Sequence, residues 1–361
     1  MKKIVAFLLA GTMAFAMTAC GSGESSSEGA SQASSGSMGE SKPESRPANG
    51  FRICMVTDAG GVNDQSFNQS AWEGLQKLEQ EQGAKVSYIE SKQEADYATN
   101  LDKAADDNAD LIWGVGFAMA DAVTVAAIAN PDIHYAIVDN AYDEATMPEN
   151  ITGVMFRAQE PSFIVGYIAA KTTKTNRVGF VGGVTSDIVD QFQYGYQAGV
   201  AYAAMELNKT VTVDVQYAES FTDASKGKAI ASKMFSDGCD IVFHAAGGVG
   251  VGVIEAAKDA NKLAIGVDRD QAYLAPKNVL TSAVKLVNVA VESVSKEIIS
   301  GEKTSGKTYT YGLTEGAVGI PEDYTLMGEK TYQDALKVEE LIKSGDVIPP
   351  ANAEEYTQFI G

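Results

Sequence analysis

The sequence has very few of the side chains from which metal centres and catalytic triads are built. It contains 2 histidines and 3 cysteines among 361 residues. His134 and His244 lie far apart in the chain, and neither has a cysteine partner at the spacing of a metal site. The chain also lacks a G-x-S-x-G nucleophile turn, a Walker phosphate loop and an H-E-x-x-H helix. We therefore expect no metal, no cofactor and no enzymatic activity.

The cysteines are also too few for a disulfide framework. After Cys20 only Cys54 and Cys239 remain, and each lies in or beside an apolar run that is typical of a strand. We expect both to be small buried residues rather than disulfide partners.

Positive charge is scarce as well. The 28 lysines and arginines are outnumbered by 48 aspartates and glutamates, which gives a formal net charge of -20. An acidic surface repels phosphate backbones, so we expect no nucleic-acid partner. The sequence shows no local basic cluster that would hold an anion. A neutral or cationic ligand is therefore favoured.

Long hydrophobic runs are absent except near the N-terminus. There, two lysines precede the apolar run Ile4–Met17, which is shorter than the roughly 20 residues of a membrane span. The pattern predicts a secretory signal peptide over residues 1–19. Met17-Thr18-Ala19-Cys20 resembles the lipobox of bacterial lipoproteins, which predicts that Cys20 carries lipid chains such as palmitate. The alternative is an ordinary cleaved signal in which Cys20 has no role.

Residues 21–50 are rich in serine and glycine and contain no aromatic or branched aliphatic side chain. Such a segment cannot bury enough apolar surface to fold. We expect the lipidated Cys20 and the residues to 50 to form a disordered tether of roughly 30 Å. It would hold the protein on the extracytoplasmic face of the cell membrane through the lipid anchor only.

The remaining chain, about 310 residues, alternates strand-like apolar runs with helical patterns and is long enough for two domains. Strands are expected at 51–57, 85–89, 110–116, 133–139, 177–182, 211–217, 240–246 and 262–267. Helices are expected at 95–108, 117–129, 161–172, 187–206, 224–236 and 249–260. This alternation predicts an α/β protein with parallel sheets covered on both faces by helices. A break near residues 151–161 predicts two lobes, each with a doubly wound sheet.

The segment Val56–Leu75 carries the strongest local signal for a binding site. Gly60 and Gly61 permit a tight turn after the first strand, and Asp64 or Ser66 can cap the helix that follows. This strand end and helix start are where open α/β sheets bind ligands. The polar and aromatic side chains left over at this place are Asp58, Asn63, Phe67 and Asn68.

Three aspartates stand at the ends of predicted strands, namely Asp58, Asp139 and Asp268. Carboxylates at the carboxyl edge of a sheet are good acceptors for paired hydroxyls, such as those of a ribose. The alternative is that each aspartate only caps the next helix. The recurrence of the pattern in three strands favours the ligand interpretation.

Phe67 and Phe221 lie in polar, glycine-bounded loops, one in each predicted lobe. Two such rings could hold a flat ring such as a purine between them, since base stacking on an aromatic contributes roughly 1–3 kcal/mol. The alternative is that both rings only cover the edges of the core.

The glycine-rich run 244–252 follows a predicted strand and opens a helix. It lacks the G-x-G-x-x-G spacing of a dinucleotide site, because Glu255 occupies the last glycine position. We interpret it as a turn whose backbone amides approach a ligand. Lys285, expected at the start of a helix over 285–300, could neutralise a buried aspartate or donate to a ligand hydroxyl; the alternative is a surface lysine.

The motifs along the chain resemble those of the basic membrane protein (Bmp) family of lipoproteins, which includes the bacterial purine nucleoside receptor. The resemblance covers nearly everything after residue 50. The segments that carry it are Val56–Leu75, Trp113–Phe117, Tyr135–Asp139, Phe156–Glu160, Ser220–Asp223, Lys226–Lys228, His244–Gly248, Gly266–Asp268 and Thr281–Lys285.

The resemblance implies a type I periplasmic-binding-protein fold with a hinge between the lobes. It implies an N-terminal lobe of residues 51–156 plus 285–305 and a C-terminal lobe of 157–284 plus 306–361.

The resemblance also implies roles for particular residues. Phe67 and Phe221 match ring-stacking positions, and Asp139, Asp268 and Lys285 match ribose-binding positions. Asp58, Asn68 and Gly247 match positions that meet the base or its surroundings.

The implied function is that of a monomeric, lipid-anchored solute-binding protein. It would capture a purine nucleoside (adenosine, guanosine or inosine) between its lobes for uptake by an ABC transporter permease. The alternatives are a binding protein for a sugar or an autoinducer-like molecule, and a nucleoside-cleaving enzyme that uses a carboxylate pair.

Overall fold

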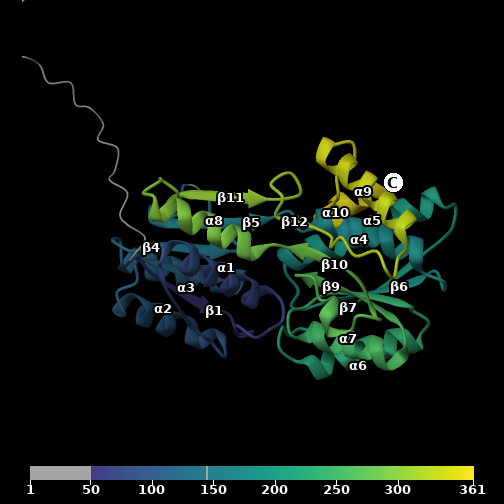
Figure 1. The fold of residues 1–361 in the computed structure, drawn as a ribbon, viewed down its shortest axis with the longest axis horizontal. Coiled ribbons are helices and arrows are strands. Elements are labelled where there is room, and N and C mark those ends of the chain that lie inside the picture. The colour runs from purple at the N-terminus through teal and green to yellow at the C-terminus, as the bar shows by residue number, and fades with distance from the viewer. Residues whose placement is uncertain (1–49, 144) are drawn as a thin grey trace, which may run out of the picture. The chain divides into compact units, whose positions relative to one another are not determined.

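The computed structural model describes residues 50–361 except residue 144. The predicted signal peptide, Cys20 and nearly all of the tether lie outside the described residues, so these predictions stay predictions. Within the described part, two six-stranded sheets each carry helices on both faces (Figure 1). This arrangement confirms the predicted α/β class and its two doubly wound lobes.

The first sheet has the strand order β11-β5-β4-β3-β1-β2, and all of its pairs are parallel. Its elements are β1 (Arg52–Thr57), α1 (Phe67–Gln82), β2 (Lys85–Ile89), η1 (Glu94–Asp96), α2 (Tyr97–Asp106), β3 (Leu111–Val115), η2 (Phe117–Met119), α3 (Ala120–Ala129), β4 (His134–Val138), β5 (Ile151–Phe156), α8 (Val287–Ile299) and β11 (Lys307–Tyr311).

The second sheet has the order β12-β10-β9-β8-β6-β7, in which only the short β12 is antiparallel to its neighbour. Its elements are α4 (Gln159–Thr172), β6 (Arg177–Gly182), α5 (Asp187–Glu206), β7 (Thr212–Tyr217), α6 (Ala224–Ser236), β8 (Ile241–Ala245), α7 (Val249–Ala260), β9 (Leu263–Asp268), η3 (Ala272–Leu274), β10 (Val279–Lys285), β12 (Val318–Gly319), α9 (Glu329–Ser344) and α10 (Ala353–Ile360).

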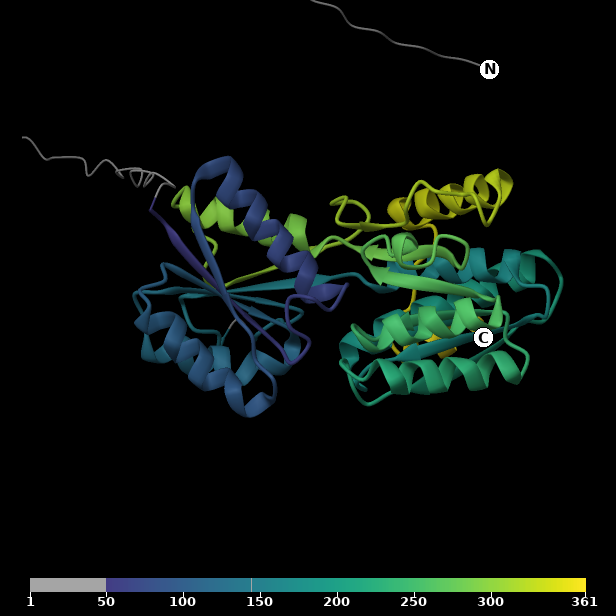
Figure 2. The same cartoon turned by 60° about the horizontal axis from the view of Figure 1, so that its bottom comes forward.

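Burial on both faces explains why the strands read as continuous apolar runs. In β1, Ile53 and Met55 pack into the core beneath α1 and α8, whereas Cys54 and Val56 pack into a second core beneath α2 and α3. A strand whose alternate side chains enter two different cores has no polar face. Figure 2 shows this sandwiching of each sheet between helices.

The two remaining cysteines are buried and free, as predicted. Cys54 lies in β1, and Cys239 lies in the turn before β8. Burial raises the pKa of both thiols.

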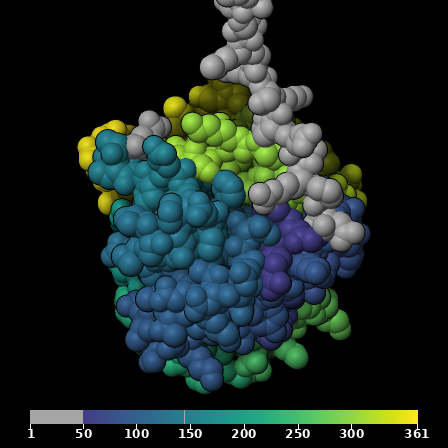
Figure 3. All heavy atoms as spheres, turned by 90° about the vertical axis from the view of Figure 1, so that its left-hand side faces the viewer, coloured from purple at the N-terminus to yellow at the C-terminus, as the bar shows by residue number. Residues whose placement is uncertain are grey.

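The chain passes between the lobes three times, after β5, after β10 and after β11. The third crossing corrects one sequence prediction. Residues 306–361 were assigned to the second lobe, but β11 pairs with β5 in the first sheet. Seen from the side in Figure 3, the light-green residues near 300 lie among the purple-to-teal residues of the first lobe. Local sequence could not predict the pairing of this short edge strand, because its partner lies far away in the chain. Lys307 is opposite Thr152, which is 155 residues earlier.

Lys285 also differs from its prediction. It is the last residue of β10 and not the first residue of a helix, and α8 begins at Val287. The run that ends in Lys285 pairs with β9 and β12, so sheet pairing and not helical periodicity decides its conformation.

Close helix packing in the second lobe depends on glycines. A methyl group at Gly199 in α5 would overlap the carbonyl oxygen of Phe163 in α4, and one at Gly166 would overlap the carbonyl oxygen of Tyr196. The absence of a side chain at these positions lets the two helix backbones lie against each other.

We predict that Gly199→Ala lowers the free energy of unfolding by about 1–3 kcal/mol, because the two helices must separate to admit the methyl group. Denaturant unfolding of the refolded protein measures this loss. Gly319→Ala is the matched control, since a methyl group there meets no atom within 4 Å. Equal effects of the two substitutions would contradict the packing explanation.

Candidate functional site

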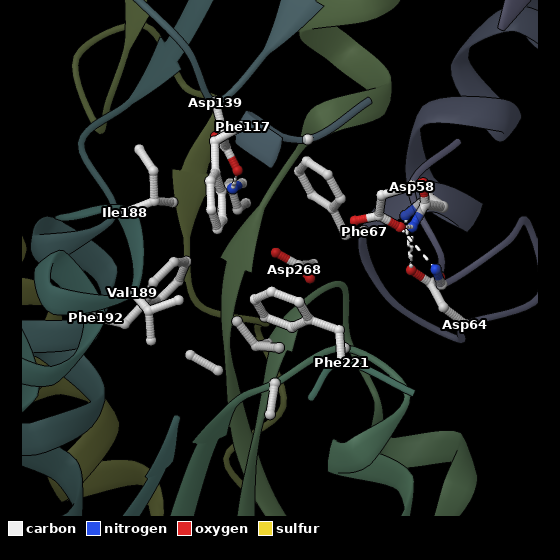
Figure 4. A pocket seen from close by; sticks show the side chains of 18 residues that line it. Asp58, Asp64, Phe67, Phe117, Asp139, Ile188, Val189, Phe192, Phe221 and Asp268 are labelled. Atoms are coloured by element: carbon white, nitrogen blue, oxygen red, sulfur yellow. Dashed lines mark hydrogen bonds and ion pairs between the residues drawn. The ribbon is translucent and has the colours of Figure 1, made fainter. Parts of the chain in front are cut away.

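A cavity lies between the carboxyl edges of the two sheets (Figure 4). The first lobe contributes Asp58, Gly60, Asp64, Phe67, Asn68, Gly116, Phe117 and Asp139. The second contributes Ile188, Val189, Phe192, Phe221, Ala245, Ala246, Gly247, Val267, Asp268 and Lys285. All eight residues selected from the sequence line this cavity, and their roles in binding stay predictions.

The positions of the three aspartates follow from the sheet topology. Asp58 and Asp139 follow β1 and β4 of the first sheet, and Asp268 ends β9 of the second. Asp139 and Asp268 have φ angles of 63° and 65°, a left-handed conformation that aspartate tolerates better than most residues. Non-glycine residues in this conformation are frequent at functional sites.

Asn68 links two carboxylates at the start of α1. Its side-chain Nδ2 donates to Asp58 Oδ1 at 2.8 Å and to Asp64 Oδ2 at 3.1 Å. Asp64 also accepts from the backbone amides of Ser66, Asn68 and Gln69, so it is the residue that caps α1. The sequence predicts Asp64 or Ser66 as the cap. Ser66 has the cap position, but its hydroxyl bonds to Asp268 and not to the helix.

That hydroxyl of Ser66 donates to Asp268 across the two lobes. Burial raises the pKa of Asp268 to about 6, although the charge of Lys285 and the Ser66 hydrogen bond act in the opposite direction. Burial likewise raises the pKa of Asp58 to about 6, against hydrogen bonds from the Gly60 amide and from Asn68. A ligand that donates a hydrogen bond to either carboxylate would therefore stabilise its ionised form.

Lys285 is the cation of the cavity. It is 2% exposed, and its Nζ lies 2.6 Å from Asp139 Oδ2. The same ammonium group lies over three aromatic rings, at 4.7 Å from the centroid of Phe67, 5.2 Å from Phe156 and 5.6 Å from Phe192. Rings that face a cation stabilise it electrostatically. Lys285 is thus a buried residue, and the alternative of a surface lysine is wrong.

The aromatic residues come from both lobes. Phe67 begins α1, and Phe221 lies in the loop before α6. Both are half-buried and pack on the main core while also lining the cavity. Figure 4 shows their rings and the carboxylate of Asp268 turned toward the same space. Both rings therefore cover the edge of the core and line the cavity, and their role in ligand binding stays a prediction.

Several residues that line the cavity are not predicted from the sequence. Phe117, which follows β3 and contacts Phe221 at a centroid distance of 6.4 Å, could have been found from its place at a strand end. Ile188, Val189 and Phe192 lie in the first turns of α5 and carry no local signal. Asn63, left over in the strongest motif, is exposed and does not line the cavity.

The glycine-rich turn before α7 contributes backbone rather than side chains. Gly247 has a φ of 54° and lies against the backbone of Phe221. A side chain at this position would be strained and would crowd the loop that holds the ring. No cluster of His, Cys, Asp or Glu among the described residues could hold a metal ion.

Further contacts join the lobes beside the cavity. Gln271 Nε2 donates to the carbonyl oxygen of Gln65 at 3.0 Å, and the Tyr273 hydroxyl donates to Gln65 Oε1 at 2.7 Å. Arg269 forms an ion pair with Glu73 at 3.0 Å. The structure therefore represents a closed arrangement, in which both lobes contact each other around the cavity.

A family model described as ABC transporter substrate-binding protein PnrA-like matches residues 51–353. The chain is 40% identical over 312 residues to Basic membrane protein A of Borreliella burgdorferi, covering 86% of this chain and 90% of that protein. It is 40% identical over 321 residues to the CD4+ T-cell-stimulating antigen of Listeria monocytogenes, covering 83% and 88%. The fold matches that of an ABC transporter system solute-binding protein from Aeropyrum pernix K1, with a TM-score of 0.77, 25% identity, and coverage of 85% and 96%.

We predict that Lys285→Met favours the open arrangement of the lobes. The variant leaves Asp139 buried without its cation, which disfavours the closed arrangement by about 3 kcal/mol; separation of the lobes lets water reach the carboxylate. Small-angle X-ray scattering of the ligand-free protein should show a larger radius of gyration.

The double variant Lys285→Met/Asp139→Asn is the control, because it leaves no unpaired charge and should return the radius toward that of the unaltered protein. An unchanged radius in the single variant would show that the ion pair does not hold the lobes together.

Proposed function

The chain belongs to the PnrA-like family of ABC transporter substrate-binding proteins, and from that premise we propose that it captures purine nucleosides between its lobes for an ABC importer. Members of this family bind substrates for a membrane transporter and are not enzymes. We therefore assign the cavity as a binding site and not as an active site.

The observation that carries the proposal is that each lobe contributes a phenylalanine to one cavity, with Phe67 from the first and Phe221 from the second. A flat heteroaromatic ring buries most of its surface against such side chains, and stacking contributes roughly 1–3 kcal/mol for each ring. A small free sugar does not need two widely spaced aromatic rings. This favours a base over a simple sugar as the ligand.

The remaining polar groups suit a ribose. Asp139 and Asp268 supply carboxylate oxygens. The ammonium group of Lys285 has three N–H donors and uses one of them for Asp139, so the others are available to a ligand. Paired hydroxyls can donate to the carboxylates and accept from the lysine. We assign these three residues to the 2′ and 3′ hydroxyls of the nucleoside.

Charge in the cavity supports a nucleoside rather than a nucleotide. Four carboxylates, Asp58, Asp64, Asp139 and Asp268, line it together with one cation, Lys285. A phosphate group would enter a region of net negative charge at low dielectric, where like charges repel strongly. The neutral or cationic ligand expected from the net charge of the chain agrees with this local balance.

The proposal includes attachment through a lipid on Cys20, which would keep the binding domain on the outer face of the membrane beside its permease. The family acts outside the cytoplasm. In the described part of the chain, every helix is too short or too polar to cross a bilayer. We further propose that the protein acts as a monomer, because one chain supplies both halves of the site.

Isothermal titration calorimetry tests the proposal. The protein is unfolded and refolded to remove any carried ligand, then titrated with adenosine, guanosine, inosine, cytidine, adenine, ribose and adenosine 5′-monophosphate. We expect tight binding of the purine nucleosides, weak or no binding of ribose, and weaker binding of the monophosphate than of adenosine. A folded protein that binds none of the nucleosides would refute the proposed function.

We predict that Phe67→Ala weakens nucleoside binding by about 1–3 kcal/mol, the contribution of one base stack. The same titration measures the loss. Tyr324→Ala is a control, because Tyr324 is 44% exposed and lies outside the cavity lining. Unaltered binding by the Phe67 variant would contradict the placement of the base against this ring.

A further inference from the structure

The loop that follows β9 makes a buried contact with the first lobe. Gln271 lies in this loop and is 0% exposed, although glutamine is ordinarily a surface residue. Its Nε2 donates to the main-chain carbonyl oxygen of Gln65 in the first lobe at 3.0 Å. Neither residue is part of the cavity lining. Direct contact with a ligand therefore does not explain why these two groups are buried together.

The second lobe by itself fixes the direction of the Gln271 side-chain amide. Its Oε1 accepts from the main-chain amide of Val267 at 3.0 Å, and a main-chain N–H can only donate, so the oxygen must face β9. The same oxygen lies 3.0 Å from Nε2 of His244 in β8. The nitrogen of the side-chain amide is therefore the group that faces the first lobe.

His244 takes part in this arrangement as a neutral donor. It is fully buried in β8, and burial lowers its pKa to about 4. A neutral imidazole has one N–H, and because Oε1 of Gln271 can only accept, that hydrogen belongs on Nε2. The ring also packs against the first turn of α7, where a β-carbon at Gly250 would overlap it. The His244 ring is thus held in place beside the Gln271 amide.

Further contacts hold Gln271 to its own sheet. Its main-chain N–H donates to Oγ of Ser282 in β10 at 3.1 Å. Its side chain lies against Gly266 in β9, where a β-carbon would approach Oε1 to 2.7 Å. A side chain that is already held in this way loses little conformational entropy when it bonds to the other lobe. Gln271 is therefore a preorganised donor.

The acceptor for this donor belongs to the turn Asp64–Ser66, directly before α1. Gln65 has a φ of 59°, which is in the left-handed region that few residues adopt. Its main-chain oxygen bonds to Gln271, and its side-chain Oε1 accepts from the Tyr273 hydroxyl at 2.7 Å. The loop after β9 thus holds Gln65 by both its main chain and its side chain. Phe67, which lines the cavity, is two residues further along the chain.

We propose that the contact between Gln271 and Gln65 is an inter-lobe latch, in which Gln271 is a positioning residue that stabilises the closed arrangement and slows the release of a captured ligand. The lobes must separate before a ligand can leave, and separation breaks this hydrogen bond. A contact that exists only in the closed arrangement acts on the dissociation rate more than on the association rate. The latch acts on any ligand in the cavity, and only the choice of nucleosides as probes rests on the proposed function.

The other contacts between the lobes at this place are more exposed. Tyr273 is 51% exposed, and in the ion pair between Arg269 and Glu73 the side chain of Glu73 is 39% exposed. Exposed ion pairs contribute little to stability. A buried hydrogen bond that loses one partner leaves the other group desolvated and unpaired, which costs more. We therefore expect Gln271 to have the largest effect of the residues in this loop.

Gln271→Glu is the sharpest test, because it alters only the group that faces the first lobe. One glutamate oxygen can still accept from Val267 and His244, whereas the other oxygen would face the carbonyl oxygen of Gln65, and two acceptors repel. We expect the dissociation rate of a bound nucleoside to rise by at least about tenfold at pH 8. The association rate should change little, since the open arrangement keeps all of its hydrogen bonds.

The rates come from two measurements on the same protein. A chase of bound tritiated guanosine or adenosine with an excess of the unlabelled nucleoside gives the dissociation rate. Titration calorimetry gives the dissociation constant, and the two values together give the association rate. A merely structural role of Gln271 would lower the fraction of folded protein and would leave the dissociation rate of the folded fraction unaltered.

Three further variants complete the test. Gln333→Glu makes the same change at an exposed position of α9 and should leave both rates unaltered. Tyr273→Phe removes only the exposed hydroxyl and should raise the dissociation rate less than Gln271→Glu does. Should Gln271→Glu fail to fold, Gln271→Met replaces it, since methionine has neither a donor nor a charge and should also raise the dissociation rate by at least about tenfold.

The outcomes separate this inference from the proposed function. If nucleosides bind and leave the Gln271 variant at the rate of the unaltered protein, the inference is wrong and the proposed function stands. If no nucleoside binds to the folded protein, the proposed function fails, and small-angle X-ray scattering of the ligand-free proteins then tests the latch. A larger radius of gyration for Gln271→Glu than for Gln333→Glu would support the inference, and equal radii would overturn it.

Discussion

The closed arrangement of the two lobes depends on one buried cation among the cavity-lining residues. Lys285 stands at the end of β10 in the second sheet, and its partner Asp139 follows β4 in the first. Buried charges are costly unless they are paired, so each of these residues keeps the other lobe close. The rings of Phe67, Phe156 and Phe192 surround the ammonium group, and the position of the pair thereby orders part of the aromatic lining as well.

The other carboxylates supply this cavity with hydrogen-bond acceptors, which suit a ligand that donates hydrogen bonds. Asp58 and Asp268 both have raised pKa values because burial removes water without supplying a full set of hydrogen bonds. A ligand rich in N–H and O–H groups would satisfy these acceptors and would contact both lobes at once, which couples binding to closure. A phosphate group, which carries negative charge and accepts hydrogen bonds, would not satisfy these acceptors.

Much of this architecture could be predicted locally. Helices α5, α6 and α7 have the bounds that the sequence predicts, because long segments with a helical pattern can be recognised from local sequence, and Ser186 and Asp223 cap the first two. The aspartates and Phe67 could be selected because they stand at strand ends or helix starts, where a parallel sheet gathers its ligands. Edge strand β11 and the strand conformation of Lys285 could not, since both depend on pairing with strands that are distant in the chain.

The sequence by itself determined the class of fold, the two-lobed division, the acidic character and the residue types from which a site could be assembled. It did so because apolar periodicity and turn preferences depend on a few neighbouring residues, and net charge depends on composition alone. The tertiary structure alone decided that Lys285 is buried against Asp139 and that Phe117 and Phe192 join the lining. These facts depend on distances between residues far apart in the chain, which only the packing of one lobe against the other fixes.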